Sequence, residues 1–232
     1  MNPDVVFLDF GGTIARQTNT REEAIAASLA MLGHSRPMPD IAKAVATARE
    51  STAGRWSNSM SFPEREEFFV GLYQVVAETL GFGGDSRAIG RHLWDTQQDS
   101  YSLYDDVLPG LQLLRGQGAR LGIISNWDKL NLTDVCRDLG IAQWFDVILP
   151  SAQAEADKPD PRIFRLALEM AGAEPQSCVH VGDSYGADVM GARGVGMIGI
   201  LVQRDGPPNF DCPTVRGLDE VPGLLARLHA GC

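Results

Sequence analysis

The sequence has few lysines and an excess of acidic residues. Among its 20 basic residues only Lys43, Lys129 and Lys158 are lysines, and 30 acidic residues give a formal net charge of −10. Nucleic acids and anionic membrane surfaces bind to basic patches, so this charge balance argues against both as the main partner. A small anionic substrate stays possible, because a few local hydrogen-bond donors are enough to hold it.

Long apolar runs and paired cysteines are also missing. The four cysteines are scattered without a CxxC pair, which excludes the usual patterns of a disulfide framework or a zinc site. No apolar stretch is long enough to span a bilayer. The first apolar run stops at Asp9 and follows no basic leader, unlike the core of a signal peptide. We therefore expect a soluble cytoplasmic protein.

The first apolar run, residues 5–8, ends in a carboxylate that is soon followed by two glycines. A short Val/Phe/Leu run bounded by turn residues predicts a buried strand of a parallel sheet. The residue after such a strand lies at its carboxyl end, where open α/β sheets bind their ligands. Asp9 is therefore a candidate active-site residue. Gly11 and Gly12 leave room beside the main chain.

Strands and helices alternate from residue 106 onward. Strands are expected over residues 120–124, 145–149, 177–181 and 197–202, and helices over residues 130–139, from Asp160, after Asp183 to Gly194, and over residues 221–228. Asp160 is placed to cap its helix and is followed by a proline at the first helical position. This alternation predicts an α/β fold with a doubly wound parallel sheet, formed by residues 1–15 and 106–232.

Residues 16–105 have a helical pattern instead. Thr20 with Glu23, and Ser61 with Glu64, form capping boxes at the starts of two expected helices. Four amphipathic helices with short connections predict a small four-helix bundle. The insert leaves the sheet after its first strand and returns before the second, so we expect it to be a cap domain over the carboxyl ends of the strands.

Polar residues gather at the predicted strand ends. Asp9, Ser125 with Asn126, and Asp183 each follow a strand, and Asp188 lies about one turn into the next helix. Lys158 precedes a helix that returns to the same edge of the sheet. Carboxylates are the oxygen ligands that Mg²⁺ prefers. The ammonium group of a lysine and the hydroxyl group of a serine can together hold phosphoryl oxygens. A carboxylate can also act as the nucleophile and form an aspartyl phosphate.

These four segments, residues 9–13, 125–126, 158–161 and 181–188, resemble the four motifs of the haloacid dehalogenase (HAD) superfamily, in order. The insert resembles that family's helical cap in position and helical character alone. Each motif is weak by itself, but four of them on successive strand ends are a strong signal.

The resemblance implies a role for each of these side chains. Asp9 would be the nucleophile and a Mg²⁺ ligand, and Asp183 a second ligand. Asp188 would bind a metal-bound water or orient Lys158, and the Gly11 carbonyl would complete the protein's share of the coordination. Ser125 and Asn126 would hold the phosphoryl oxygens, while Lys158 would neutralise their charge.

Gly11 departs from the family's phosphatase pattern. Phosphatases of the family carry a second aspartate at this position, as the acid for the leaving group and then the base for water. Losing such an acid typically removes about 10² to 10⁴ in rate. The chain is therefore expected to be a slow phosphatase, to act on a substrate that needs no acid, to take an acid from the cap, or to perform other chemistry.

We interpret the chain as a Mg²⁺-dependent hydrolase, in first place a phosphatase of a small phosphorylated compound. One alternative is a catalytically silent protein that binds a phosphorylated ligand. Dehalogenases lack the second aspartate too, but they also lack the metal-binding acids. Phosphonatases lack it and use a cap lysine, for which Lys43 is the one candidate, although a solvated role suits it better. His180, inside an apolar strand, is expected to be a core histidine.

Overall fold

The chain forms two compact units in a computed structural model, which describes residues 3–97, 99–207 and 210–230. The first unit combines Met1–Arg16 with Ser102–Cys232, and the second is Gln17–Tyr101. We call them the sheet unit and the helical unit. Each has its own buried apolar cluster.

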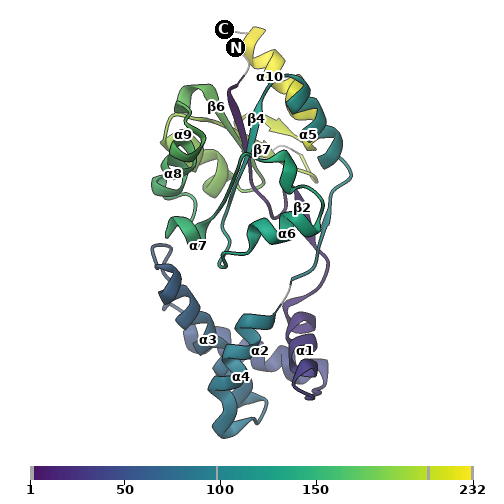
Figure 1. Cartoon of the computed structure of the whole chain (residues 1–232), viewed down its shortest axis with the longest axis vertical. Helices are drawn as coiled ribbons and strands as arrows, with labels where there is room; N and C mark the ends of the chain where they lie inside the picture. Colours follow the sequence, from purple (N-terminus) through teal and green to yellow (C-terminus); the bar gives the residue numbers. More distant parts are fainter. Residues whose placement is uncertain (1–2, 98, 208–209, 231–232) are drawn as a thin grey trace. The chain divides into compact units, whose positions relative to one another are not determined.

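A parallel sheet of six strands is the centre of the sheet unit (Figure 1). Its strands in spatial order are β5 (Val147–Pro150), β4 (Arg120–Ser125), β1 (Val5–Leu8), β6 (Cys178–Gly182), β7 (Ile198–Val202) and β8 (Thr214–Val215). Every neighbouring pair is parallel. The predicted doubly wound α/β fold is confirmed.

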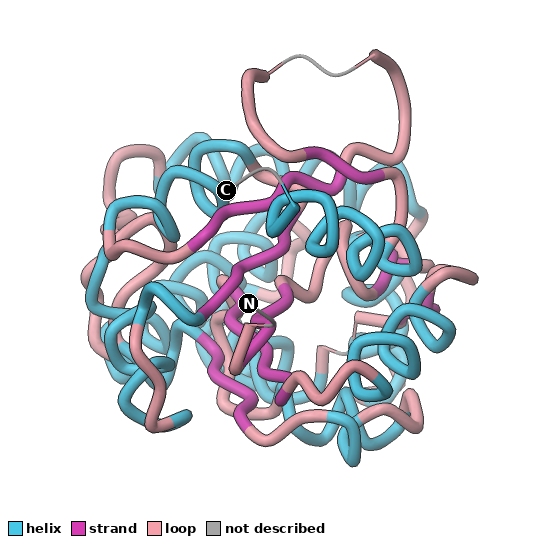
Figure 2. Tube along the Cα trace, turned by 90° about the horizontal axis from the view of Figure 1, so that it is seen from above, coloured by secondary structure: helices cyan, strands magenta, loops and turns pink. Residues whose placement is uncertain are grey.

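The strands are apolar because both faces of the sheet are covered. All residues of β1 and β6 are buried, as expected for a parallel sheet between two helical layers. On one face lie α8 (Pro161–Ala171) and α9 (Gly191–Gly194), and on the other α5 (Val107–Gly116) and α10 (Val221–Ala230) (Figures 1 and 2). Two further helices, α6 (Leu132–Asp138) and α7 (Ser151–Ala154), complete the connections around β5.

The start of α8 follows directly from its sequence. The Asp160 side chain accepts a hydrogen bond from the Arg162 N–H at 2.9 Å, and Pro161 occupies the first helical position. Gly172 ends the helix with a left-handed φ of 57°. A side-chain cap at the start of a helix, such as Asp160, typically stabilises it by about 1 kcal/mol. The predicted start of this helix is confirmed, and it fixes the segment that carries Lys158.

Some elements differ from the sequence prediction. The helix after β6 begins as a π-helix over Tyr185–Met190 and becomes α-helical only in α9. Three short strands were not predicted from the sequence: β8, β2 (Ala15–Gln17) and β3 (Tyr101–Leu103). β2 pairs with β3, and these two strands lie in the two segments that connect the units. Two or three residues are too few to show a hydrophobic period.

The helical unit contains α1 (Arg21–Met31), α2 (Met38–Thr52), α3 (Phe62–Thr79) and α4 (Ser86–Thr96). Both expected capping boxes are present, at Thr20 with Glu23 and at Ser61 with Glu64. The four helices pack around one apolar cluster that includes Leu29, Ile41 and Leu93. Lys43 lies on the exposed side of α2.

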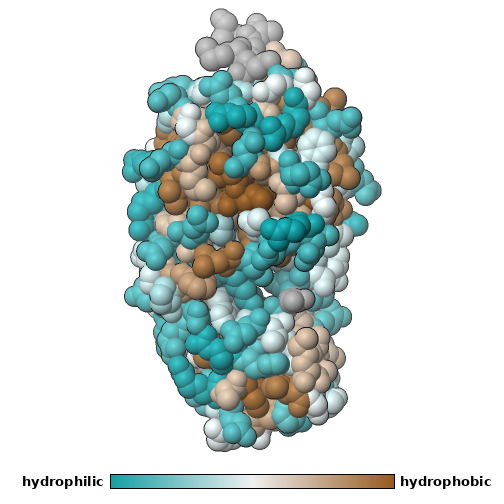
Figure 3. All heavy atoms as spheres, in the orientation of Figure 1, coloured by the Kyte–Doolittle hydropathy of each residue, from teal (hydrophilic) through white to brown (hydrophobic). Residues whose placement is uncertain are grey.

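Hydrophilic side chains make up most of the face drawn in Figure 3. Among the described residues, none of the helices is both long and apolar enough to span a lipid bilayer.

Candidate active site

Three carboxylates converge at the carboxyl edge of the sheet. Asp9 follows β1 and Asp183 follows β6, and these two strands are direct neighbours. Asp188 lies in the π-helix that follows β6. One carboxylate oxygen from each of the three residues lies within 4.8 Å of the others. The structure therefore brings together the acidic residues that the sequence selected.

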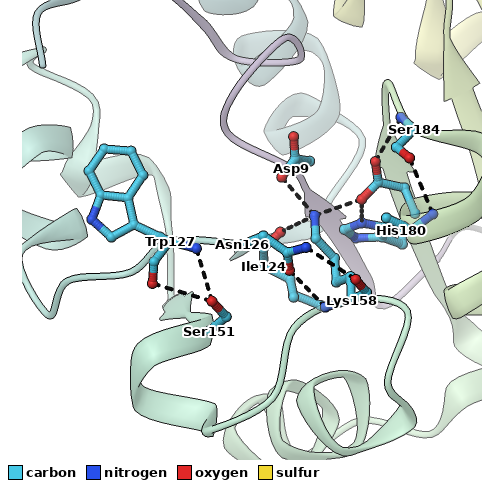
Figure 4. Close-up of polar contacts among 10 residues, drawn as sticks. Asp9, Ile124, Asn126, Trp127, Ser151, Lys158, His180 and Ser184 are labelled. Carbon is cyan, nitrogen blue, oxygen red and sulfur yellow. Dashed lines mark hydrogen bonds and ion pairs between the residues drawn. The ribbon is translucent and has the colours of Figure 1, made fainter. Parts of the chain in front are cut away.

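Lys158 lies between two of these carboxylates (Figure 4). Its Nζ donates to Asp9 Oδ1 at 2.6 Å, to Asp188 Oδ1 at 2.6 Å and to the Ile124 carbonyl at 2.8 Å. An ammonium group has three N–H bonds, so all of its donors are used. The side chain is almost fully buried, and this contact network fixes the position of its charge.

Asp188 accepts hydrogen bonds from three residues. Besides Lys158, His180 Nε2 lies 2.9 Å from Asp188 Oδ1, and the Ser184 N–H donates to Oδ2 at 2.9 Å. His180 is fully buried in β6, as the sequence predicts for a core histidine. Burial lowers the pKa of His180. The neutral ring must therefore donate through Nε2, because an ionised carboxylate can only accept.

The two carboxylates at Lys158 differ in proton affinity. Burial and, to a lesser extent, the negative charge of Asp188 together raise the pKa of Asp9 to about 6, although the positive charge of Lys158 lowers it. For Asp188 burial acts in the same direction, but Lys158 and His180 outweigh it and hold the pKa below its ordinary value. The pKa of Lys158 is raised, because the two carboxylates outweigh burial. Asp188 is therefore the permanent counter-ion of Lys158, and Asp9 holds its charge less firmly.

Two glycines make room for the carboxylates. A Cβ atom on Gly12, where φ is +77°, would lie 2.2 Å from Asp183 Oδ2. A Cβ atom on Gly182 would lie 2.2 Å from Asp188 Cγ. Gly11 is different: it is exposed, its φ is not left-handed, and a Cβ atom there would have no heavy atom within 4 Å. A side chain is thus sterically allowed at Gly11 and forbidden at Gly12.

The segment after β4 is held by side-chain contacts to the main chain (Figure 4). Asn126 Oδ1 accepts from the Lys158 N–H at 2.7 Å, and Asn126 Nδ2 donates to the Lys158 carbonyl at 3.1 Å. Ser151 Oγ accepts from the Trp127 N–H at 3.0 Å. Asn126 therefore positions Lys158, and one N–H of its amide group remains for a ligand.

Ser125 is available for a ligand. Its side chain ends β4 and is buried, and no described residue hydrogen-bonds to its hydroxyl group. Its predicted contact with a phosphoryl oxygen stays a prediction, as does that of Asn126.

The roles of two serines were not predicted from the sequence: Ser151 Oγ accepts a hydrogen bond from the Trp127 N–H, and the Ser184 N–H donates to Asp188. The contact of His180 with Asp188, eight residues away, was not predicted either. His180 could have been suspected, because a polar side chain inside an apolar strand needs a partner.

A comparison with family models agrees with this geometry. Residues 3–196 match the model of the haloacid dehalogenase-like hydrolases. The chain belongs to this haloacid dehalogenase-like hydrolase family. The family membership predicted from the four sequence motifs is therefore confirmed.

Known proteins resemble this chain in sequence. It is 42% identical over 155 residues to haloacid dehalogenase-like hydrolase domain-containing protein 3 of Homo sapiens, covering 64% of this chain and 59% of the human protein. It is 30% identical over 144 residues to a glyceraldehyde 3-phosphate phosphatase of Methanopyrus kandleri, covering 57% of this chain and 62% of that protein. The chain spans about half the length of the first curated relatives it matches.

A solved structure has the same fold. The 2-haloacid dehalogenase of Pseudomonas syringae pv. Tomato DC3000 superposes with a TM-score of 0.73 at 21% identity, covering 98% of this chain and 100% of that one. This similarity concerns the fold, and the chemistry has to be argued from the site.

Proposed function

We propose that this chain is a Mg²⁺-dependent phosphatase of small phosphorylated compounds that works through an aspartyl phosphate at Asp9. The observation that carries the proposal is the arrangement of three carboxylates, with oxygens within 4.8 Å of one another, around the buried Lys158 ammonium. A phosphatase name among the relatives supports the reaction class.

The donor set fits a hard cation. Mg²⁺ takes oxygen ligands, usually one or two carboxylates with waters and substrate oxygens. Asp9 and Asp183 would hold it, with the Gly11 carbonyl as a third ligand. Asp188 is occupied by its three donors and would act through water or through Lys158. When bound, the cation would neutralise charge on the phosphoryl group.

The residues of the chain can carry out both chemical steps. Lys158 occupies Asp9 Oδ1, and no described residue hydrogen-bonds to Asp9 Oδ2, which can attack phosphorus. The bond from phosphorus to the leaving oxygen breaks, and that oxygen keeps the electron pair. Water then attacks the phosphorus of the aspartyl phosphate, Asp9 leaves as a carboxylate, and the proton of water passes to phosphate or solvent. The positive charge of Lys158, whose N–H groups bond Asp9, Asp188 and the Ile124 carbonyl, stabilises the phosphoryl oxygens in both steps by electrostatic attraction.

We also propose that the helical unit is the cap domain and selects the substrate. Other chemistries find less support. A dehalogenase has no use for Asp183 and Asp188. A phosphonatase would need Lys43, which is an exposed side chain on α2.

The missing acid at Gly11 makes aryl phosphates the better substrates. A phenolate leaves without a proton, whereas an alkoxide needs one. We therefore expect kcat/KM for p-nitrophenyl phosphate to exceed that for glyceraldehyde 3-phosphate by about 10²-fold or more, from the usual contribution of a general acid. Steady-state rates with and without Mg²⁺ measure this ratio. Equal values of kcat/KM would show that the missing acid at Gly11 does not limit the reaction, and would indicate that another residue supplies the acid.

The affinity for Mg²⁺ should fall in acid. With a pKa of about 6, Asp9 is ionised above pH 7 and protonated below pH 5, and a proton must leave before the cation binds. At pH 5 about one tenth of Asp9 is ionised, so Kd should be about tenfold higher than at pH 7.5. Calorimetric titration with MgCl₂ at both pH values measures this. A constant Kd between these values would contradict the proposed role of Asp9 as a ligand.

A further inference from the structure

Arg204, which follows β7, hydrogen-bonds to the segment that follows the nucleophile Asp9. Its Nε donates to the Gly12 carbonyl at 3.2 Å, and its Nη2 donates to the Thr13 carbonyl at 2.7 Å. Both carbonyls belong to the turn that follows Asp9. One side chain thus holds two consecutive peptide groups of this turn.

The guanidinium group is itself fixed. Nη1 donates to Asp106 Oδ1 at 2.7 Å and Nη2 to Asp106 Oδ2 at 3.2 Å, and the carboxylate also accepts from the Leu218 N–H at 2.6 Å. The carbon of the guanidinium group lies 3.6 Å from the centroid of the Tyr104 ring. Burial would raise the pKa of Asp106, but these hydrogen bonds lower it, so the pair is ionised.

The turn held by Arg204 determines the space around the acidic residues. Gly12 lies directly against Asp183, because a Cβ atom at Gly12 would be 2.2 Å from Asp183 Oδ2. Gly11 lies between Asp9 and Gly12. A change in the path of the main chain at residues 12–13 would therefore move the Gly11 carbonyl and alter the approach of Asp183 to Asp9.

We propose that Arg204, with Asp106 and Tyr104, is a positioning residue that holds the turn after Asp9 in the shape required to bind the cation. The inference rests on the proposed function, in which Asp9, Gly11 and Asp183 hold Mg²⁺. Lysine cannot replace arginine here. Its ammonium group is a point charge with three donors, whereas the planar fork of arginine bonds a carboxylate and two carbonyls at once.

The chain offers a matched control. Arg115 donates to the Trp144 carbonyl from Nε at 3.2 Å and from Nη2 at 2.7 Å, and it forms an ion pair with Asp146 at 3.2 Å. Trp144 and Asp146 precede β5, so this second arrangement lies at the amino edge of the sheet, away from the carboxylates. Arg204→Lys and Arg115→Lys therefore remove similar contacts at opposite edges.

The test is calorimetric titration of the full chain with MgCl₂, together with kcat and KM for p-nitrophenyl phosphate. Residues that support metal ligands typically contribute about 10- to 100-fold to metal affinity. We expect Kd for Mg²⁺ to rise by this factor in Arg204→Lys, with a fall in kcat at subsaturating Mg²⁺ and little change in KM. Arg115→Lys should keep the wild-type Kd even if its thermal stability falls equally.

An unchanged Kd in folded Arg204→Lys would overturn the proposal, and so would an equal loss in Arg115→Lys. If circular dichroism shows that Arg204→Lys is unfolded, Asp106→Asn takes its place. That variant keeps both hydrogen bonds from Arg204 to the turn but weakens the ion pair that holds Arg204 in place, so we expect a smaller rise in Kd. An unchanged Kd would refute the positioning role of Arg204. A wild-type chain that binds no Mg²⁺ would refute the proposed function and this inference with it.

Discussion

Replacing Asp9 by asparagine should lower kcat for p-nitrophenyl phosphate by about 10⁴-fold or more, the scale seen when an enzyme loses its nucleophile. Asparagine has the shape of aspartate, and its oxygen can still accept from Lys158. It lacks the negative oxygen that attacks phosphorus. Initial rates with saturating Mg²⁺ measure the loss.

The matched control for this variant is Asp4→Asn. Asp4 is exposed and lies just before the same strand, at the opposite edge of the sheet. We expect wild-type kcat in Asp4→Asn and an unaltered circular dichroism spectrum in both variants. Turnover by Asp9→Asn at the wild-type rate would refute the mechanism.

Replacing Gly11 by aspartate should raise activity toward alkyl phosphates. The position is exposed, has a φ that any residue adopts, and leaves a new side chain free of contacts within 4 Å. A carboxyl group there would be two residues from the nucleophile and could protonate the leaving oxygen. We expect kcat/KM for an alkyl phosphate such as glyceraldehyde 3-phosphate to rise by about 10²-fold. The value for p-nitrophenyl phosphate should change little, because phenolate needs no acid.

The adjacent glycine provides the control. Gly12→Asp adds the same group one residue later, but there φ is +77° and the Cβ atom would collide with Asp183. That variant should lose both Mg²⁺ binding and activity. If Gly11→Asp left the ratio of alkyl to aryl activity unchanged, the missing acid would not be what limits the enzyme.

The sequence predicted the sheet and the position of the carboxylates because those features are local. A buried strand is visible in residues 5–8, and the start of α8 is visible in Asp160 and Pro161. Once the strands are known to be parallel, their carboxyl ends must share one edge. Asp9 and Asp183 could therefore be placed together without any knowledge of side-chain contacts.

Contacts between residues that are distant in the chain could not be predicted from the sequence. Arg204 meets Gly12 across 192 positions, and Ser151 meets Trp127 across 24. Neither contact leaves a periodic pattern, and Arg204 is one of many arginines. The double contact of Asn126 with the main chain of Lys158 was missed for the same reason, since the motif indicates that Asn126 is near the phosphoryl group but not which atoms it holds.

Trapping the intermediate tests the central claim most directly. The chain is mixed with p-nitrophenyl phosphate and Mg²⁺, quenched in acid during turnover, digested and analysed by mass spectrometry. The account predicts one phosphoryl group on the peptide that contains Asp9, absent from Asp9→Asn and from a sample without Mg²⁺. Turnover of the substrate with no phosphoryl group on Asp9, or with the group on another residue, would contradict it.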